Sequence, residues 1–346
     1  MWPLVKLVSI MPAEPRSQSQ GLSRDVVAIV GAGSIGAAWA LVFAQADCLV
    51  RLYDTNQARL PEALSEVAAR LADLESFGLL QEPPQHISSR VTTTSDLPSA
   101  VEQATYVQEC ASEQPEVKRA LFAKLDALAP SATTLASSSS FMPASRFASD
   151  LPGRARVLLV HPGNPPYLLR IAEVVPAPFT SDETVGATMD FLSRAAMQPV
   201  LLNKEIDGFL FNRLQGAVLR EAYSLVRDGV ASVHDIDRIV RDGLGLRWSV
   251  LGPFETADLN TRDGLAAHAE RMGPAYIRMA SEPGRNDPWS PELVAAVTAQ
   301  RRQALPLEDW PERVAMRDRA LMALLRCRRT EPDLKPFTDA PPPPAA

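Results

Sequence analysis

Apolar and polar positions in the N-terminal part of the chain predict alternating strands and helices. A buried strand is expected at residues 26–30 (VVAIV), followed by GAGSIG, a helix in AAWALVFAQA and a second strand, LVRLYD, that ends at Asp54. Residues 58–80 then carry apolar side chains at helical spacing, up to Gly78. We therefore expect a strand–helix–strand unit followed by a long helix that makes an excursion from the sheet.

The alternation continues to about residue 203. Further strands are predicted in TYVQEC, TTLASSSS, RVLLVHP and IAEVVP, with helices at 115–130 and after Pro143. This order predicts an α/β fold, a Rossmann-type doubly wound and mostly parallel sheet. After QPVLLNKEIDGF the pattern becomes helical, beginning with LFNRLQGAVLREAYSLVRDG, so an all-helical second domain should follow.

These patterns divide the chain into four parts. We expect an NAD-binding domain at 25–203 and a helical substrate and dimerisation domain at 204–330. Residues 1–24 are expected to be a disordered arm, or to follow from a start codon placed too early. Residues 331–346 are expected to be a disordered proline-rich tail, because FTDAPPPPAA cannot pack.

Composition narrows the class of protein. The chain has 346 residues, is 46% apolar and has a net charge of −6 without a long Lys/Arg run. It should form a substantial core and should bind neither nucleic acid nor an anionic membrane. Three distant cysteines, Cys48, Cys110 and Cys327, suggest no disulfide framework and no metal site, which fits a reducing cytoplasm.

GAGSIG has the register of a dinucleotide-binding loop. Its residues are Gly31, Ala32, Gly33, Ser34, Ile35 and Gly36. The loop follows a predicted strand and opens a predicted helix, whose N-terminal amides would face a pyrophosphate. Asp54, at the end of the second strand, can accept hydrogen bonds from ribose hydroxyls, which favours NAD over NADP. A chance GxGxxG and an ordinary turn aspartate are the alternative.

VHPGNPPYLLRIAEVVP places His161 before a rigid turn and Glu173 in an apolar run. Imidazole is suited to remove a hydroxyl proton during hydride transfer, and a carboxylate on its other nitrogen would fix the tautomer. The spacing is equally compatible with a histidine that only caps the turn and a glutamate at the surface.

Six motifs occur in a familiar order: GAGSIG, LASSSSF, VHPGNPPY, IAEVVP, GFLFNRL and LGPFE. Over roughly residues 26–260 the chain resembles the 3-hydroxyacyl-CoA dehydrogenase superfamily. HPxNPPY and the later LGLRW are most similar to the branch with lambda-crystallin, L-gulonate 3-dehydrogenase and carnitine 3-dehydrogenase. The resemblance implies an NAD-dependent dehydrogenase that acts on a CH–OH group.

The resemblance also implies roles for four residues. His161 would be the catalytic base and Glu173 its orienting partner, while Ser140 and Asn212 would hydrogen-bond the reacting oxygen. Taken alone, the serines could form a solvated loop and Asn212 could be a polar residue inside a helix. The run of four serines departs from the usual Ser/Asn/Thr pattern, so the hydroxyl next to Ser140 is an alternative.

Cofactor contacts and dimerisation are implied as well. Glu113, Lys118 and Asn164 fall where the family contacts the cofactor ribose and nicotinamide. A homodimer built through the helical domain is expected, because the family dimerises there and the apolar stripes of 209–226 and 312–326 exceed what one small helical layer can cover.

The substrate has two interpretations within this class. Residues 55–85 hold two arginines and five acidic residues, a net charge of −3, which makes a poor clamp for the phosphates of coenzyme A. Arg247, in the glycine-punctuated GLGLRWSVLGPFE, could hold a free carboxylate with two hydrogen bonds, or it could be a surface arginine. Trp248 could face a quaternary ammonium, but a place in the core is the better expectation for it.

We therefore expect a dehydrogenase of a small L-3-hydroxy acid that resembles gulonate, carnitine or hydroxybutyrate. An L-3-hydroxyacyl-CoA dehydrogenase of fatty-acid metabolism is the first alternative. A non-catalytic, crystallin-like structural protein is the second.

Overall fold

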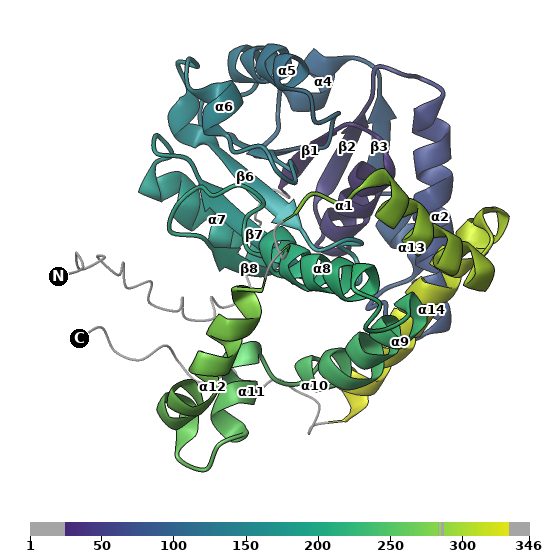
Figure 1. Ribbon diagram of the computed structural model, residues 1–346. Helices are drawn as coiled ribbons and strands as arrows, with labels where there is room; N and C mark the ends of the chain where they lie inside the picture. Colours follow the sequence, from purple (N-terminus) through teal and green to yellow (C-terminus); the bar gives the residue numbers. More distant parts are fainter. Residues whose placement is uncertain (1–24, 283, 285–286, 332–346) are drawn as a thin grey trace.

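The computed structural model describes residues 25–282, 284 and 287–331 (Figure 1). The expected arm at 1–24, and the expected tail from residue 332 onward, lie outside the described residues.

Eight strands form one sheet in the order β3-β2-β1-β4-β5-β6-β7-β8. The strands are β1 (Val26–Val30), β2 (Leu49–Tyr53), β3 (Val91–Thr94), β4 (Tyr106–Glu109), β5 (Thr134–Ser137), β6 (Val157–Pro162), β7 (Ile171–Pro176) and β8 (Gln198–Leu201). All neighbours pair in parallel except β6 and β7. The segment between these two strands is too short for a crossover helix, so the chain returns antiparallel.

Helices cover both faces of the sheet (Figure 1). They are α1 (Ser34–Gln45), α2 (Arg59–Ser76), α3 (Pro84–Ser88), α4 (Leu97–Val101), α5 (Pro115–Leu128), α6 (Ser145–Ala148) and α7 (Asp182–Arg194), with a 3-10 turn at Arg154–Arg156. Alternate residues of β1 enter opposite cores: Val27 and Ile29 pack with α1, α2 and α7, whereas Ala28 and Val30 pack with α4, α5 and α6. Burial on both faces explains why β1 is apolar throughout.

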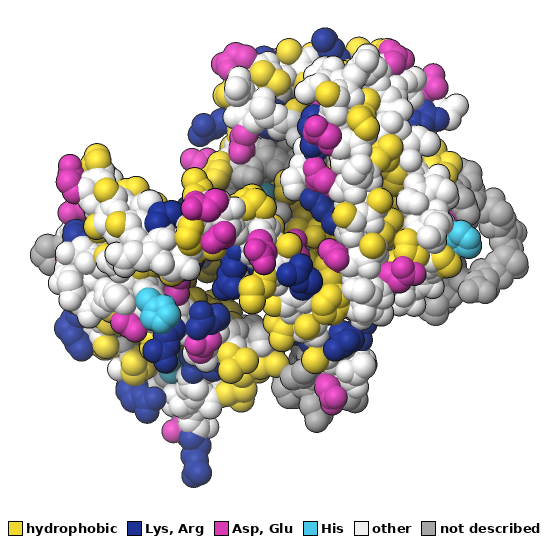
Figure 2. Space-filling model, turned by 90° about the vertical axis from the view of Figure 1, so that its right-hand side faces the viewer, with side chains coloured by type: hydrophobic (Ala, Val, Ile, Leu, Met, Phe, Trp, Pro, Cys, Tyr) yellow, Lys and Arg dark blue, Asp and Glu magenta, His cyan; other side chains and the backbone are white. Residues whose placement is uncertain are grey.

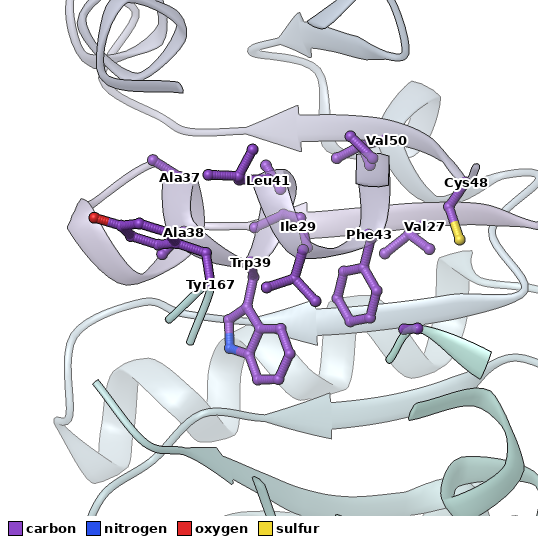
Figure 3. Packing of buried hydrophobic residues seen from close by; sticks show 14 of the residues in the cluster. Val27, Ile29, Ala37, Ala38, Trp39, Leu41, Phe43, Cys48, Val50 and Tyr167 are labelled. Carbon is purple, nitrogen blue, oxygen red and sulfur yellow. The ribbon is translucent and has the colours of Figure 1, made fainter. Parts of the chain in front are cut away.

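Aromatic rings fill the core between α1, the sheet and α7. Trp39 and Phe43 stack with ring centroids 5.1 Å apart, and Phe43 contacts Phe191 of α7 at 5.2 Å. Figure 3 shows these side chains of α1 directed toward the strands, with Tyr167 lying beside Ala38. This packing fixes α1, and hence the loop at its N-terminus, against the sheet.

The described chain beyond β8 is helical. Its elements are α8 (Phe211–Arg227), α9 (Val233–Arg238), a π-helix (Ile239–Gly245), α10 (Leu246–Trp248), α11 (Pro253–Leu259), α12 (Gly264–Ala280), α13 (Pro291–Ala304), a 3-10 turn (Leu307–Asp309) and α14 (Trp310–Thr330). The expected fold class, a Rossmann-type mostly parallel sheet followed by a helical domain, is therefore confirmed.

The last helix departs from one expectation. Met322 of α14 is fully buried in the core of the nucleotide-binding domain, and Leu321 and Leu325 pack against the same cluster. These three side chains of the apolar stripe at 312–326 therefore pack against their own chain and are not available to a partner subunit. None of the helices in the described part of the chain is both long and apolar enough to cross a membrane.

Candidate active site

The loop after β1 has the geometry that a dinucleotide needs. Gly31 has a φ of 112°, and a Cβ there would lie 2.7 Å from the carbonyl oxygen of Cys110. At Gly33 a Cβ would meet no atom within 4 Å, so this face of the loop is open to a ligand. The first amides of α1 have no intrahelical acceptor and point to the same place. Backbone, space and partial charge therefore fit the pyrophosphate of NAD.

Asp54 is held at this loop by the backbone. Its Oδ2 accepts a hydrogen bond from the amide of Ala32 at 2.8 Å, and its Oδ1 accepts one from the amide of Asn56 at 2.8 Å. The carboxylate is thus fixed next to the glycines at the end of β2, where a ribose would lie.

Glu113 organises the turn after β5. Its Oε1 accepts hydrogen bonds from the hydroxyl of Ser139 and from the amides of Ser140 (2.7 Å) and Phe141 (2.8 Å). Partial burial acts to raise the pKa of Glu113, but these hydrogen bonds outweigh it and lower the pKa below its usual value. The carboxylate therefore stabilises the serine turn from inside.

The four serines have different surroundings. Ser137 donates to buried Glu109, Ser138 accepts from Trp39 and Gln108, and Ser139 donates to Glu113. Among the described residues, none hydrogen-bonds the Ser140 hydroxyl. The carbonyl of Ser140 accepts a hydrogen bond from Nδ2 of Asn212 at 2.9 Å, so these two residues lie together. Of the four hydroxyls, that of Ser140 is the one available to a ligand.

His161 and Glu173 face each other across the antiparallel pair of β6 and β7. Nδ1 of His161 lies 2.7 Å from Oε2 of Glu173, and both side chains are buried. An ionised carboxylate only accepts, so Nδ1 carries the proton and Nε2 is the nitrogen available to a substrate. The structure thus brings together the pair that the sequence left undecided.

The second oxygen of Glu173 is bound by the start of α8. Oε1 accepts hydrogen bonds from the amides of Leu210 (2.6 Å) and Phe211 (3.0 Å). The tight turn before α8 makes this possible, because Gly208 and Phe209 both have positive φ, 75° and 49°. The Phe209 ring is fully buried, with its centroid 5.5 Å from that of His161. The N-terminal partial charge of α8 also stabilises the carboxylate.

Two cofactor residues expected from the resemblance lie in different settings. The turn places Asn164 at the surface near His161. Lys118 is 1% exposed, and its Nζ donates to both oxygens of Glu109 at 2.9 and 2.7 Å. This differs from the expected contact with the cofactor, because a buried ammonium needs a carboxylate that compensates its charge.

The region around Arg247 also differs from expectation. The residues before it form a π-helix that runs into α10, so the glycine-punctuated segment is helical and Arg247 lies on a helix. Its side chain is exposed, and Trp248 is 40% exposed instead of buried in the core. In the view of Figure 1, α8 lies between α10 and the sheet.

A cavity of about 190 Å³ lies beside the histidine. Its walls include His161, Glu173 and the exposed side chains of Phe211 and Leu214 on α8. Neither Ser140 nor Arg247 lines it. The described residues contain no group of three or more His, Cys, Asp or Glu side chains that could hold a metal ion.

Two arginines at the cofactor loop were missed by the sequence analysis. Arg59 donates from Nε and Nη2 to the carbonyl oxygen of Ala32, and Arg70 donates to the hydroxyl and carbonyl oxygens of Ser34. Their spacing along α2 was visible in the sequence, but nothing in it showed that this face of α2 turns toward the loop.

Family models match nearly the whole described chain. The model for the NAD-binding domain of 3-hydroxyacyl-CoA dehydrogenases matches residues 26–206, and the model for their C-terminal domain matches residues 208–306.

Individual proteins show the same similarity. A lambda-crystallin homolog of Bos taurus is 38% identical, with 92% of this chain and 99% of that protein covered. An L-carnitine dehydrogenase of Streptomyces griseus is 36% identical over 87% of this chain and 89% of its own length. The crystal structure of an NAD⁺-dependent dismutase, a 5-formyl-3-hydroxy-2-methylpyridine 4-carboxylic acid 5-dehydrogenase, aligns with a TM-score of 0.77 at 25% identity and covers 89% of this chain and 99% of its own.

Proposed function

The chain belongs to the 3-hydroxyacyl-CoA dehydrogenase family and is an NAD-dependent dehydrogenase that acts on CH–OH, and from this premise we propose that it oxidises the 3-hydroxyl group of a small free L-3-hydroxy acid. The observation that carries the proposal is the His161–Glu173 pair, fixed by the start of α8, with the free hydroxyl of Ser140 held next to Asn212.

His161 is the general base in this proposal. Its Nε2 takes the proton of the substrate hydroxyl, and the imidazolium that forms is stabilised by Glu173 through Nδ1. The Ser140 hydroxyl and the second hydrogen of the Asn212 amide orient the same substrate oxygen. NAD, when bound, accepts the hydride from the carbon.

The proposed cofactor site is formed by the glycine loop and by polar side chains near it. The loop from Gly31 to Gly36 would hold the pyrophosphate, and Asp54 would accept hydrogen bonds from the adenosine ribose. Glu113 fixes the serine turn, and exposed Asn164, three residues after His161, would contact the nicotinamide. Lys118 affects the cofactor site only indirectly. It binds the buried carboxylate of Glu109, which accepts a hydrogen bond from the Ser137 hydroxyl.

The pairing of arginines on α2 favours a free acid over a coenzyme A ester. Arg59 forms ion pairs with Glu62 at 2.7 Å and Glu66 at 3.0 Å, and Arg70 pairs with Glu66 at 3.1 Å. Both guanidiniums also bind the cofactor loop. Neither is available to clamp the phosphates of coenzyme A without loss of these contacts.

The remaining proposals concern the rest of the molecule. We place the carboxylate of the substrate on Arg247, and we propose that two copies associate through the helical domain. The three thiols are free, which is consistent with the reducing cytoplasm as the location.

The test is NADH production by the purified protein with a panel of L-3-hydroxy acids, including gulonate, carnitine and 3-hydroxybutyrate, each next to its coenzyme A ester where one exists. We expect turnover of a free acid at least tenfold above that of any ester. Preference for an ester would establish the acyl-CoA alternative. Tight NADH binding without turnover of any substrate would favour the crystallin-like, non-catalytic alternative.

A further inference from the structure

Three distant parts of the chain meet at Tyr167. This residue belongs to the turn that follows His161, and its ring is buried, with 4% exposure, beside Ala38 of α1 (Figure 3). Its hydroxyl points away from the core and donates a hydrogen bond of 3.0 Å to Oδ2 of Asp318 on α14, 151 residues further along the chain.

An arginine that also binds the cofactor loop lies over the face of the Tyr167 ring. The guanidinium of Arg70 lies over the ring, 5.4 Å from its centroid. The same guanidinium donates from Nη2 to the Ser34 hydroxyl at 3.0 Å and from Nη1 to the Ser34 carbonyl at 3.3 Å. Ser34 is the first residue of α1, so Arg70 holds the part of the loop whose amides face the pyrophosphate.

Helix α14 is held in place independently of Asp318. Met322 is fully buried in the same core as Tyr167, and Arg329 donates to the carbonyl oxygen of Leu79 at 3.1 Å. Asp318 is itself ion-paired with Arg317 at 2.7 Å, and its side chain is 16% exposed. Helix α14 lies beyond residue 306, where the family match ends, so the domain models do not account for this contact.

We propose that Arg70, Tyr167 and Asp318 are positioning residues for the dehydrogenase, and that they fix the cofactor loop relative to the turn that follows His161. None of them reaches the reacting atoms. They act through Ser34 on one side and through the His161 turn on the other, with α14 as the support. Hydride transfer depends steeply on the relative placement of cofactor and base, so a loose connection here lowers the rate. The role that this proposal gives to His161 rests on the proposed function. The expected effect of these residues on the cofactor loop does not depend on that function.

The test measures NADH affinity by fluorescence titration in Arg70→Met, Asp318→Asn and the double variant. We expect NADH affinity to fall about tenfold in Arg70→Met, about threefold in Asp318→Asn, and by clearly less than their product in the double variant. In a Tyr167→Leu background, where the connecting side chain is gone, the two effects should become additive. Arg319→Met, an exposed arginine of the same helix, is the matched control and should leave affinity unchanged.

A second pair of variants covers the case in which Tyr167→Leu does not fold. Tyr167→Phe keeps the ring and removes only the hydroxyl, so it should match Asp318→Asn, and combining the two should add nothing further. With a turned-over substrate at saturating NAD, kcat expressed per NADH-binding site from the titration should fall while KM for the acid stays within about twofold. Counting sites by NADH binding removes the contribution of unfolded protein, which would otherwise lower the apparent kcat in the same way.

The outcomes separate this inference from the proposed function. Unchanged NADH affinity in Asp318→Asn and Tyr167→Phe, or additivity of Arg70→Met and Asp318→Asn in the protein that retains Tyr167, would overturn the inference even if the protein oxidises hydroxy acids. Coupled losses of NADH affinity would support the connection to the cofactor loop even if no hydroxy acid in the panel is oxidised.

Discussion

At the scale of single residues, the site depends on carboxylates that each accept several hydrogen bonds. Glu173 divides its two oxygens between His161 and the first amides of α8, and Glu113 gathers the serine turn around one oxygen. Engaged carboxylates keep their neighbours in one orientation, which a base and a substrate-binding hydroxyl both require.

His161→Ala should therefore lower kcat by about 10²- to 10⁴-fold, because general-base catalysis contributes on that order. The dissociation constant of NADH should change by less than about threefold, since His161 is outside the cofactor loop. Steady-state kinetics and NADH titration measure the two effects. His86→Ala, at an exposed histidine of α3, is the control and should be fully active. Substantial activity in His161→Ala would remove this residue from the mechanism.

Glu113 gives a pH dependence with a defined sign. Its pKa is lower in the folded protein than in the unfolded chain, so the stability it contributes is complete above the unfolded value of about 4.3 and is lost as pH falls through the folded value. Glu113→Gln should lower the free energy of unfolding by about 1 kcal/mol at neutral pH, a modest effect because the side chain is solvent-accessible.

Denaturant titrations of both proteins across pH 3 to 8 test this expectation. The difference between wild type and Glu113→Gln should be constant above about pH 5 and should shrink at lower pH. Glu116→Gln, at an exposed position of the next helix, should show no such trend. A difference that grows toward acid pH would contradict the assignment.

At the scale of elements, the helical part reaches the His161–Glu173 pair through the beginning of α8. The turn at Gly208 and Phe209 directs the first amides of α8 at Glu173, and Asn212, the residue directly after Phe211, binds the backbone of Ser140. One helix N-terminus thus contacts both sides of the site. Helix α10 contrasts with it, because its side chains are exposed and it does not line the cavity beside His161.

Arg247→Met tests whether α10 nevertheless anchors the substrate. A role in binding requires the helical part to close over the cleft or a second copy to bring its own α10. Loss of a charge-assisted bidentate contact should raise KM for a free 3-hydroxy acid by tens-fold or more, an effect of about 2 to 5 kcal/mol, and Arg247→Lys should recover only part.

The effect of Arg247→Met on the free acid is compared with its effect on an ester of the same acid. Its KM should rise far less in Arg247→Met, because it has no free carboxylate. Arg241→Met is a matched control, since Arg241 is exposed nearby and pairs with Asp242. Equal losses for acid and ester would show that Arg247 is not the anchor.

At the scale of the whole molecule, the two domains differ in how far their apolar side chains are buried. The nucleotide-binding domain has two extensive buried clusters, whereas Ser224 is the only buried residue of α8. Large apolar side chains of the helical part are strongly exposed, among them Leu214 (64%), Ile239 (68%) and Phe254 (75%). Figure 2 shows hydrophobic side chains reaching the surface in patches on one face of the molecule. Exposed apolar surface of this extent indicates an interaction face.

We expect a homodimer at micromolar concentration, with about twice the chain mass of 37.6 kDa in sedimentation velocity. Leu214→Glu should shift the protein toward monomer, because a charge in a buried apolar interface is unfavourable. Leu128→Glu, on α5 of the nucleotide-binding domain and 40% exposed, should leave the dimer intact. A wild-type protein that sediments only as monomer would refute the dimer.

The sequence by itself determined the order of the elements and most of the local structure, but it predicted six of the eight strands and missed the short edge strands β3 and β8. Apolar strands, the glycine loop and the amphipathic α2 are signals carried within a few consecutive residues, and the boundaries of β1, β6 and β7 lie within one residue of the expected ones. The six ordered motifs determined the family, because short motifs gain specificity when they occur together in one order and in the expected structural context.

Only the tertiary structure decided which groups share an environment. It distinguished Ser140 from three neighbouring serines, paired Lys118 with Glu109 inside the protein, and joined Tyr167 to Asp318. It also left Trp248 at the surface, where local hydrophobicity had suggested burial. The physical reason is the same in each case. Burial, charge compensation and hydrogen-bond partners arise from residues far apart in the chain, and no short segment of sequence specifies them.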